Sequence, residues 1–325
     1  MNTLTKVFFS HKSFVFAGGM ILCWLISVRF VLSDTEIRNT VRGRIIDTFS
    51  EKPVEGVKLQ FFAYPAGNLI HEYMTDSSGY YYREIIQEKK LTTKLINLIF
   101  RGSEQKSYKT YTGWFKVIFS HPGYYRAVRY SKGMNVLNTD IIPLTFDMEL
   151  FDMWCRASPQ GSIPLQRWIE KPKWFIYTGP AIGSDIEITR EKIDLVKEII
   201  QKDLVKFTHG FINGAHIEEG EETQLDNLEG WVLIYWSDTG GPGYHSVYVN
   251  GNIIFSAIVQ LSTTWFYRRT YLGELTKILG LTHDVDTLNI WNNDGYYLPE
   301  GYDVGKILYS RPHGSMSPDE DPAPF

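Results

Sequence analysis

Residues 265–281 read WFYRRTYLGELTKILGL, and this stretch restricts the fold of the C-terminal half more than any other. Its apolar residues recur at the spacing of one helical face: Leu272, Leu275, Ile278 and Leu279. Gly280 follows them, at the position where a glycine commonly ends a helix. The stretch therefore predicts an amphipathic helix that packs on a core and ends at Gly280.

The same stretch resembles the zinc-binding helix of metzincin proteases, H-E-x-x-H-x-x-G-x-x-H. In that motif two histidines one turn apart bind zinc, the glutamate is the general base, and the glycine lets the chain turn toward the third histidine. Here Glu274 takes the base position, Gly280 the turn and His283 the third ligand position. Gly273 and Lys277 hold the other two ligand positions.

Those two departures decide the chemistry that we expect. A catalytic zinc ion needs three protein ligands and an open position for water. Glycine offers no ligand atom and a lysine ammonium repels a cation, so His283 is the only ligand-position residue left. We expect no metal site and no cofactor, and we expect Glu274 to pair locally, for instance with Lys277 or Arg269. Glu274 remains the one catalytic candidate.

The residues around this helix carry a second resemblance. The segments 273–286, 290–294, 307–309 and 314–320 follow the order of an uncharacterised family of exported bacterial proteins, with E-L-x-x-x-L-G-L-x-N-D-x-D, an FNDD-like turn and a final LYD…GM segment. His283 replaces the usual Asn of that family, and Trp291 its usual Phe. The family's helix also lacks the zinc histidines. The resemblance implies a zincin-like α+β fold for residues 172–316 and no known reaction.

The chain upstream of the helix fits a domain of strands and helices. Residues 174–177 and 231–236 are predicted strands, and apolar residues at helical spacing predict a helix that Thr189 caps and that ends at Gly210. Asn250-Gly251 is a strong signal for a hairpin between residues 244–249 and 253–260.

Residues 38–150 predict a different architecture, because short alternating segments are separated by turn residues. Residues 41–47 (VRGRIID), 53–57 (PVEGV) and 75–80 (TDSSGY) match the V-x-G-x-I-x-D, P-V-x-G-V and T-D-x-x-G-Y pattern of the carboxypeptidase regulatory-like family. That resemblance implies an all-β, prealbumin-like sandwich that serves as an accessory module. The basic insertion 87–112 has no predicted place in it.

Two further segments complete the expected organisation. Residues 151–171 contain Pro159, Gly161 and Pro164 and little periodicity, which predicts a linker strapped to a domain by Trp154 and Trp168. Residues 317–325 (SPDEDPAPF) predict a flexible acidic tail.

The first 33 residues predict export. They hold no acid, and an apolar run over residues 14–28 follows Lys6 and Lys12. This is the pattern of a secretory signal peptide, with cleavage before Asp34. An uncleaved anchor over residues 14–32 is the alternative. Either way, we expect the rest of the chain in the periplasm or associated with the cell envelope.

Composition narrows the classes of function. The formal charge of the 325 residues is −4, which argues against a nucleic-acid partner because such proteins need a basic face. Two cysteines exclude a disulfide-stapled scaffold and a multi-thiolate zinc ribbon. Aromatic residues make up 15% of the chain, which argues against disorder.

Other candidate sites are weaker. His209, His216 and His245 are scattered, which favours loop or surface positions over metal ligation. Acidic and amide side chains at 284, 286, 292 and 294 miss the EF-hand spacing and fit turns better. Cys155 lies in the predicted linker without a nearby histidine, which argues against a nucleophile.

The sequence thus predicts a multidomain chain, with an all-β prealbumin-like sandwich followed by an α+β zincin-like domain. We expect a non-catalytic envelope protein that binds a protein partner or belongs to an envelope assembly. The alternative is a peptidase-like hydrolase that uses Glu274. Carbohydrate binding through exposed tryptophans and tyrosines, such as those at 80–82, is a third possibility.

Overall fold

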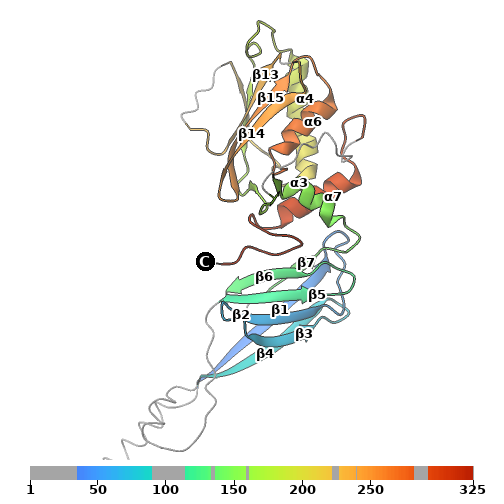
Figure 1. Ribbon diagram of the computed structural model, residues 1–325, viewed down its shortest axis with the longest axis vertical. Helices are drawn as coiled ribbons and strands as arrows, with labels where there is room; N and C mark the ends of the chain where they lie inside the picture. The colour runs from blue at the N-terminus through green and yellow to red at the C-terminus, as the bar shows by residue number, and fades with distance from the viewer. Residues whose placement is uncertain are drawn as a thin grey trace, which may run out of the picture.

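The computed structural model describes residues 35–89, 114–132, 136–158, 161–221, 227–238, 240–281 and 292–324. Within these ranges a β-sandwich and a larger part of mixed helices and strands lie one above the other along the long axis (Figure 1). The expected export segment 1–33, most of the insertion 87–112 and His283 lie outside the described residues.

The N-terminal part consists of two sheets. The first has the order β4-β1-β7, with strands Tyr80–Lys89, Thr35–Asp47 and Thr139–Ile141. The second has the order β3-β2-β5-β6, with strands Leu69–Met74, Lys58–Tyr64, Trp114–Ser120 and Ala127–Lys132. Alternate residues of β2 and β5 are buried between the sheets, including Leu59, Phe61 and Val117. The predicted β-sandwich is therefore confirmed.

The C-terminal part is built on a six-stranded sheet. The order is β10-β15-β13-β11-β12, and β14 pairs with the free edge of β15. The strands are Arg167–Trp168 (β10), Lys173–Tyr177 (β11), Ile217–Gly220 (β12), Trp231–Ser237 (β13), Gly243–Asn250 (β14) and Ile253–Ser262 (β15). Every pairing is parallel except that of β14 with β15, which forms the hairpin predicted at Asn250-Gly251.

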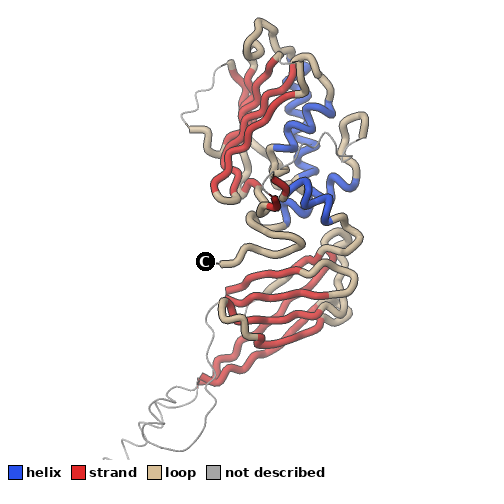
Figure 2. Tube along the Cα trace, in the orientation of Figure 1, coloured by secondary structure: helices blue, strands red, loops and turns tan. Residues whose placement is uncertain are grey.

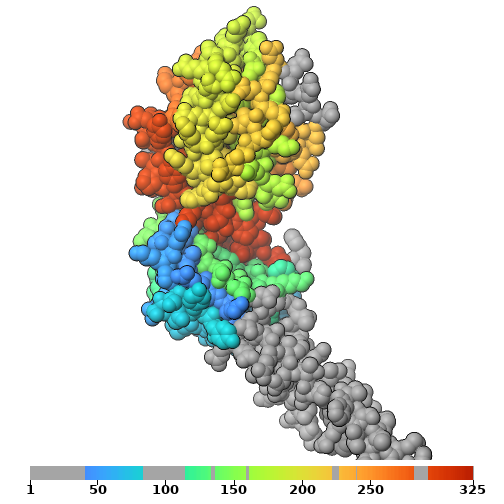
Figure 3. Space-filling view, turned by 180° about the vertical axis from the view of Figure 1, so that it is seen from behind, coloured from blue at the N-terminus to red at the C-terminus, as the bar shows by residue number. Residues whose placement is uncertain are grey.

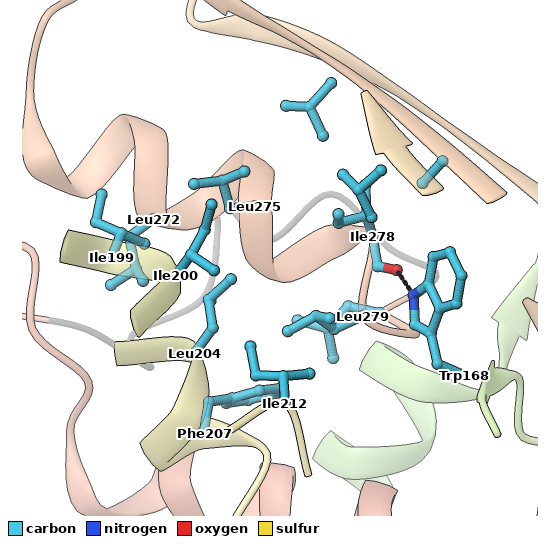
Figure 4. Packing of buried hydrophobic residues seen from close by; sticks show 14 of the residues in the cluster. Trp168, Ile199, Ile200, Leu204, Phe207, Ile212, Leu272, Leu275, Ile278 and Leu279 are labelled. Atoms are coloured by element: carbon cyan, nitrogen blue, oxygen red, sulfur yellow. Dashed lines mark hydrogen bonds between the residues drawn. The ribbon is translucent and has the colours of Figure 1, made fainter. Parts of the chain in front are cut away.

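Helices pack on one face of this sheet (Figure 2). They are α3 (Met148–Cys155), α4 (Arg190–Glu198), α6 (Arg268–Lys277) and α7 (Pro299–Ser310); α4 runs on through a π-helical stretch, Ile199–Leu204, into α5 (Val205–Phe207). Leu272 and Leu275 of α6 contact Ile200 and Leu204 in the main core, as Figure 4 shows. The predicted helix is thus present over Arg268–Lys277, but it is not amphipathic in its burial, because every residue from Tyr271 to Lys277 is buried, Glu274 and Lys277 included. None of the described helices has the length and apolar character needed to cross a bilayer.

Residues 151–171 are part of this larger domain, so the predicted linker is wrong. Residues 148–150, expected within the sandwich, begin helix α3 instead. Phe151, Cys155 and Trp168 are at most 2% exposed and belong to the main core. The indole of Trp168 also donates to the Ile278 carbonyl at 2.9 Å (Figure 4). Prolines and glycines interrupt the sequence pattern, but the segment still contributes Phe151, Trp154, Cys155, Leu165 and Trp168 to the main core.

The predicted flexible tail is also wrong for the described residues up to 324. Asp319 is fully buried, and the backbone around it pairs with the edge strand β6. The Val128 amide donates to the Asp319 carbonyl at 2.9 Å, and the Asp321 amide donates to the Val128 carbonyl at 3.0 Å. Acidic composition predicts solvation because an unpaired buried carboxylate is costly, but arginines of both domains supply the partners here.

These arginines form an interdomain clasp, by which we mean Arg129, Asp140, Arg311 and Asp319. Asp319 accepts from Arg129 at 2.8 Å on one oxygen and from the Arg311 Nε at 2.7 Å on the other. Arg311 also donates to Asp140 of β7 at 2.8 Å. Burial alone would raise the pKa of Asp140, but the charge and hydrogen bonds of Arg311 outweigh it and the pKa is lowered. The segment that carries Arg311 and Asp319 lies at the junction of the two domains (Figure 3).

Asp321 lies next to the clasp, and its carboxylate has a weaker ion pair than those of Asp319 and Asp140. Burial, together with the charges of Asp319 and Asp140, raises its pKa to about 6, although Arg129 lies 3.5 Å away. The folded state therefore binds the proton more tightly than the unfolded state, and stability falls as the pH rises from about 4 through 6.

We expect Asp321→Asn to stabilise the protein at pH 7 by on the order of 2 kcal/mol, since the variant has no charge to bury. At pH 4 the gain should be much smaller, because the carboxyl is then protonated in the folded state and partly protonated in the unfolded state. Urea unfolding at the two pH values measures the difference. If Asp321→Asn stabilised the protein more at pH 4 than at pH 7, the raised pKa of Asp321 would be contradicted.

Candidate functional site

Glu274 lies in the middle of α6 and is 3% exposed. One carboxylate oxygen accepts from the Lys277 ammonium at 2.9 Å, and the other lies 3.0 Å from Nδ1 of His245. Lys277 is as buried as Glu274, whereas the His245 side chain on β14 is one third exposed. We refer to these three residues as the Glu274 cluster.

The fold brings the cluster together by packing α6 against the edge strand β14. At the start of β14, Gly243 has a positive φ of 143° and lies close to the helix. A Cβ at this position would come within 3.1 Å of the Glu274 side chain and 2.7 Å of the Gln260 carbonyl oxygen. Glycine therefore permits the close approach that sets His245 beside Glu274.

Electrostatics keep Glu274 ionised. Burial alone would raise the pKa of Glu274, but hydrogen bonds from His245 and Lys277, with the charge of Lys277, lower it below its usual value. A general base must reach the proton that it removes from water or substrate. Both oxygens of Glu274 already have protein partners, so the carboxylate is a buried structural anion in this arrangement.

At position 277 a lysine cation stands where the zinc-binding motif has a metal ligand. Lys277 stands where the metzincin motif has its second histidine, and its ammonium supplies the positive charge nearest to Glu274. Local pairing of Glu274 with Lys277 was predicted and is confirmed. The third residue, His245, was predicted at a loop or surface. The alternation of β14 could have indicated otherwise, because Val247 and Val249 on the same face pack against the main core.

The other candidates stay apart from the cluster. His209 and His216 are exposed; His209 contacts the Tyr302 carbonyl and His216 contacts Glu218. Asn292 accepts from the amides of Asp294 and Tyr296, as expected of a turn. Cys155 is fully buried, and burial raises the pKa of its thiol far above the usual value.

No group of three or more histidine, cysteine or acidic side chains is placed to hold a metal ion in the part of the chain that the structure describes. His283 and the acidic residues at 284 and 286 lie outside that part. The residues at the two remaining ligand positions, Gly273 and Lys277, do not fit a zinc ion, because one has no side-chain donor and the other is a cation engaged with Glu274.

No known protein family and no curated protein matches the chain. Among solved structures, it is similar to the Bacillus anthracis TIE protein over 33% of this chain and 17% of that one, with 7% identity and a TM-score of 0.22. It is also similar to hydroxyquinol 1,2-dioxygenase from Pseudomonas putida DLL-E4 (12% identity; 34% of this chain, 58% of that one; TM-score 0.22). Shaft pilin spaA from Lactobacillus rhamnosus GG matches at 9% identity (33% of this chain, 48% of that one; TM-score 0.22).

The chain thus spans less than two thirds of each of these structures, and each match involves about a third of this chain. Similarities of this size carry no inference about activity or ligands. The resemblances to the carboxypeptidase regulatory-like family and to zincin-like proteins stay predictions.

Proposed function

We propose that this chain is an exported, non-catalytic protein with a carboxypeptidase regulatory-like sandwich and a zincin-like domain, which binds a protein partner or forms part of a cell-envelope assembly. The observation that carries the proposal is the Glu274 cluster. A carboxylate that is buried, ionised and bonded on both oxygens has no proton-transfer role in this arrangement.

The surroundings of α6 support the zincin-like assignment. Gly280 follows the helix at the position of the motif's glycine and has a φ of 120°. A Cβ there would lie 2.4 Å from the Gln166 carbonyl oxygen, so only glycine allows the chain to turn at this point without displacing its neighbour. The turn of the motif is therefore kept while two ligand positions are lost, which is the pattern of a scaffold that has no catalytic metal.

Binding rather than catalysis is also favoured by the outer surface. Large aromatic side chains are exposed on both domains, among them Tyr82, Tyr244, Trp265 and Tyr267. Aromatic residues are enriched where protein interfaces form. Export is proposed from the N-terminal sequence pattern. The rest of the chain holds one cysteine, Cys155, and therefore no internal disulfide, which is compatible with export.

Metal analysis of the purified full chain tests the proposal directly. We expect zinc well below one ion per chain, both as purified and after incubation with zinc followed by dialysis. Stoichiometric zinc that survives dialysis would overturn the non-catalytic assignment.

The alternative, a peptidase-like hydrolase based on Glu274, predicts a different result. If the cluster is structural, the wild type should hydrolyse casein and peptidoglycan peptides only at background level, and Glu274→Gln should leave that level unchanged. The exposed Glu229→Gln is the matched control, because it removes the same charge far from α6. Wild-type hydrolysis that Glu274→Gln abolishes and Glu229→Gln preserves would establish the hydrolase, provided that circular dichroism shows Glu274→Gln still folded, because this change leaves the buried Lys277 ammonium without its carboxylate.

A further inference from the structure

A cleft of about 550 Å³ lies at the junction of the two domains, away from the Glu274 cluster. Its floor is the outer face of the sheet β4-β1-β7, and α7 forms the opposite wall. The sandwich contributes Arg44, Tyr80, Asn138 and Asp140 to its lining, and α7 contributes Lys306 and Ser310. The volume is within the range of about 300–1,000 Å³ that is typical of small-molecule sites.

Strand register explains the composition of the floor. Val41 and Ile45 of β1 point into the sandwich core, so Arg44 and Ile46 point outward. Arg44 stands directly opposite Tyr80 of β4, and Ile46 directly opposite Asp140 of β7. The same alternation buries Tyr81 and leaves Tyr80 53% exposed. An arginine and a tyrosine ring are therefore fixed side by side on a rigid sheet.

Most charges of the cleft are already balanced, and one is not. Asp140 is paired with Arg311 of the clasp, and Lys306 lies 3.3 Å from Glu51. Arg44 has no acidic partner among the residues that the structure describes. Its guanidinium lies over the Tyr80 ring, 5.6 Å from the centroid, which orients the planar group while its donors stay free.

Neutral polar groups surround this cation. The Asn138 side-chain carbonyl accepts from the Arg44 amide at 2.9 Å, which fixes the Asn138 amide and leaves its NH₂ group as a donor. The exposed Ser310 hydroxyl and the Tyr80 hydroxyl line the same cleft. The cleft thus combines a single oriented guanidinium, several hydroxyl and amide groups, and an aromatic edge.

We propose that this cleft binds an acidic sugar, that is, a ligand with one carboxylate and several hydroxyl groups. The carboxylate would form a bidentate pair with Arg44, the hydroxyls would bond to Asn138 and Ser310, and Tyr80 would contact the apolar face of the sugar ring. The site goes beyond the proposed function, because it requires neither the Glu274 cluster nor the protein partner.

Calorimetric titration of the full chain with D-glucuronate tests the site, with D-glucose and inorganic phosphate as comparison ligands. We expect saturable binding of glucuronate and clearly weaker binding of glucose and phosphate. Arg44→Gln should weaken glucuronate binding about tenfold or more, since it removes a charge-assisted bidentate contact. Arg126→Gln, at an exposed arginine of the same domain outside the cleft, should bind as the wild type does.

Arg44 is exposed, so Arg44→Gln should keep the wild-type melting temperature, and its binding result can be interpreted directly. Absence of glucuronate binding overturns the proposal, as does equal loss in the Arg44 and Arg126 variants. Phosphate binding as tight as that of glucuronate would show recognition of charge alone and would also overturn it. None of these outcomes affects the metal content, so the proposed function is tested separately.

Discussion

Lys277→Met should lower the free energy of unfolding by about 3–5 kcal/mol, the usual cost of removing one partner from a buried ion pair. The Lys277 side chain is 4% exposed and that of Glu274 is 3% exposed, so the orphaned carboxylate has little water to replace the ammonium. His245 would remain as its single partner. Urea unfolding followed by tryptophan fluorescence measures the loss.

Two comparisons make this result specific. In the double variant Glu274→Gln/Lys277→Met no buried charge is left alone, so much of the lost stability should return. Lys202→Met removes a lysine that pairs with Glu198 on the surface of the same domain, and it should change stability little. A Lys277 variant as stable as the Lys202 variant would show that the Glu274 cluster is not the buried ion pair described above.

Arg311→Met should be similarly costly, at about 3–5 kcal/mol, because it leaves Asp319 and Asp140 without their shared partner. Arg311 is 2% exposed, and Asp319 is fully buried. Since the clasp joins the two domains, we also expect the variant to separate their unfolding. Scanning calorimetry should show two transitions for Arg311→Met where the wild type shows one.

The control for Arg311 is Arg190→Met, which removes an exposed arginine that is paired with Asp194 and Glu219. It should leave a single transition near the wild-type temperature. Adding Asp140→Asn to Arg311→Met should recover part of the stability, because the Asp140 carboxylate is paired with Arg311, whereas Asp319 keeps Arg129. A single unshifted transition in Arg311→Met would mean that the clasp does not couple the domains.

Local patterns predicted the parts of the structure that depend on near neighbours in the chain. Alternation identified the sandwich strands, and helical spacing identified the apolar residues by which α6 joins the main core. The turn after Asp76 is equally local, with its carboxylate accepting from the amides of Ser78 and Tyr80. Each of these signals is complete within about ten residues, so no tertiary information is needed to interpret it.

Features that depend on distant partners were missed. Trp168 looked like part of a linker because its hydrogen-bond acceptor, the Ile278 carbonyl, is 110 residues away. Asp319 looked solvated because its two arginines come from different parts of the chain. Glu274 was identified from its motif, and its partner Lys277 is one turn away. Its other partner, His245, is joined to it only when β14 packs on α6.

The clasp has a consequence for the order in which the protein is assembled. Arg129 and Asp319 are 190 residues apart, so the sandwich can be complete long before its partner in the clasp has been synthesised. Until residues 311–321 arrive, strand β6 keeps an open edge and Arg129 lacks its buried partner Asp319. The clasp therefore forms after the sandwich strands have been synthesised, and a protease that cuts between Arg311 and Asp319 would sever the segment that carries two of its four members.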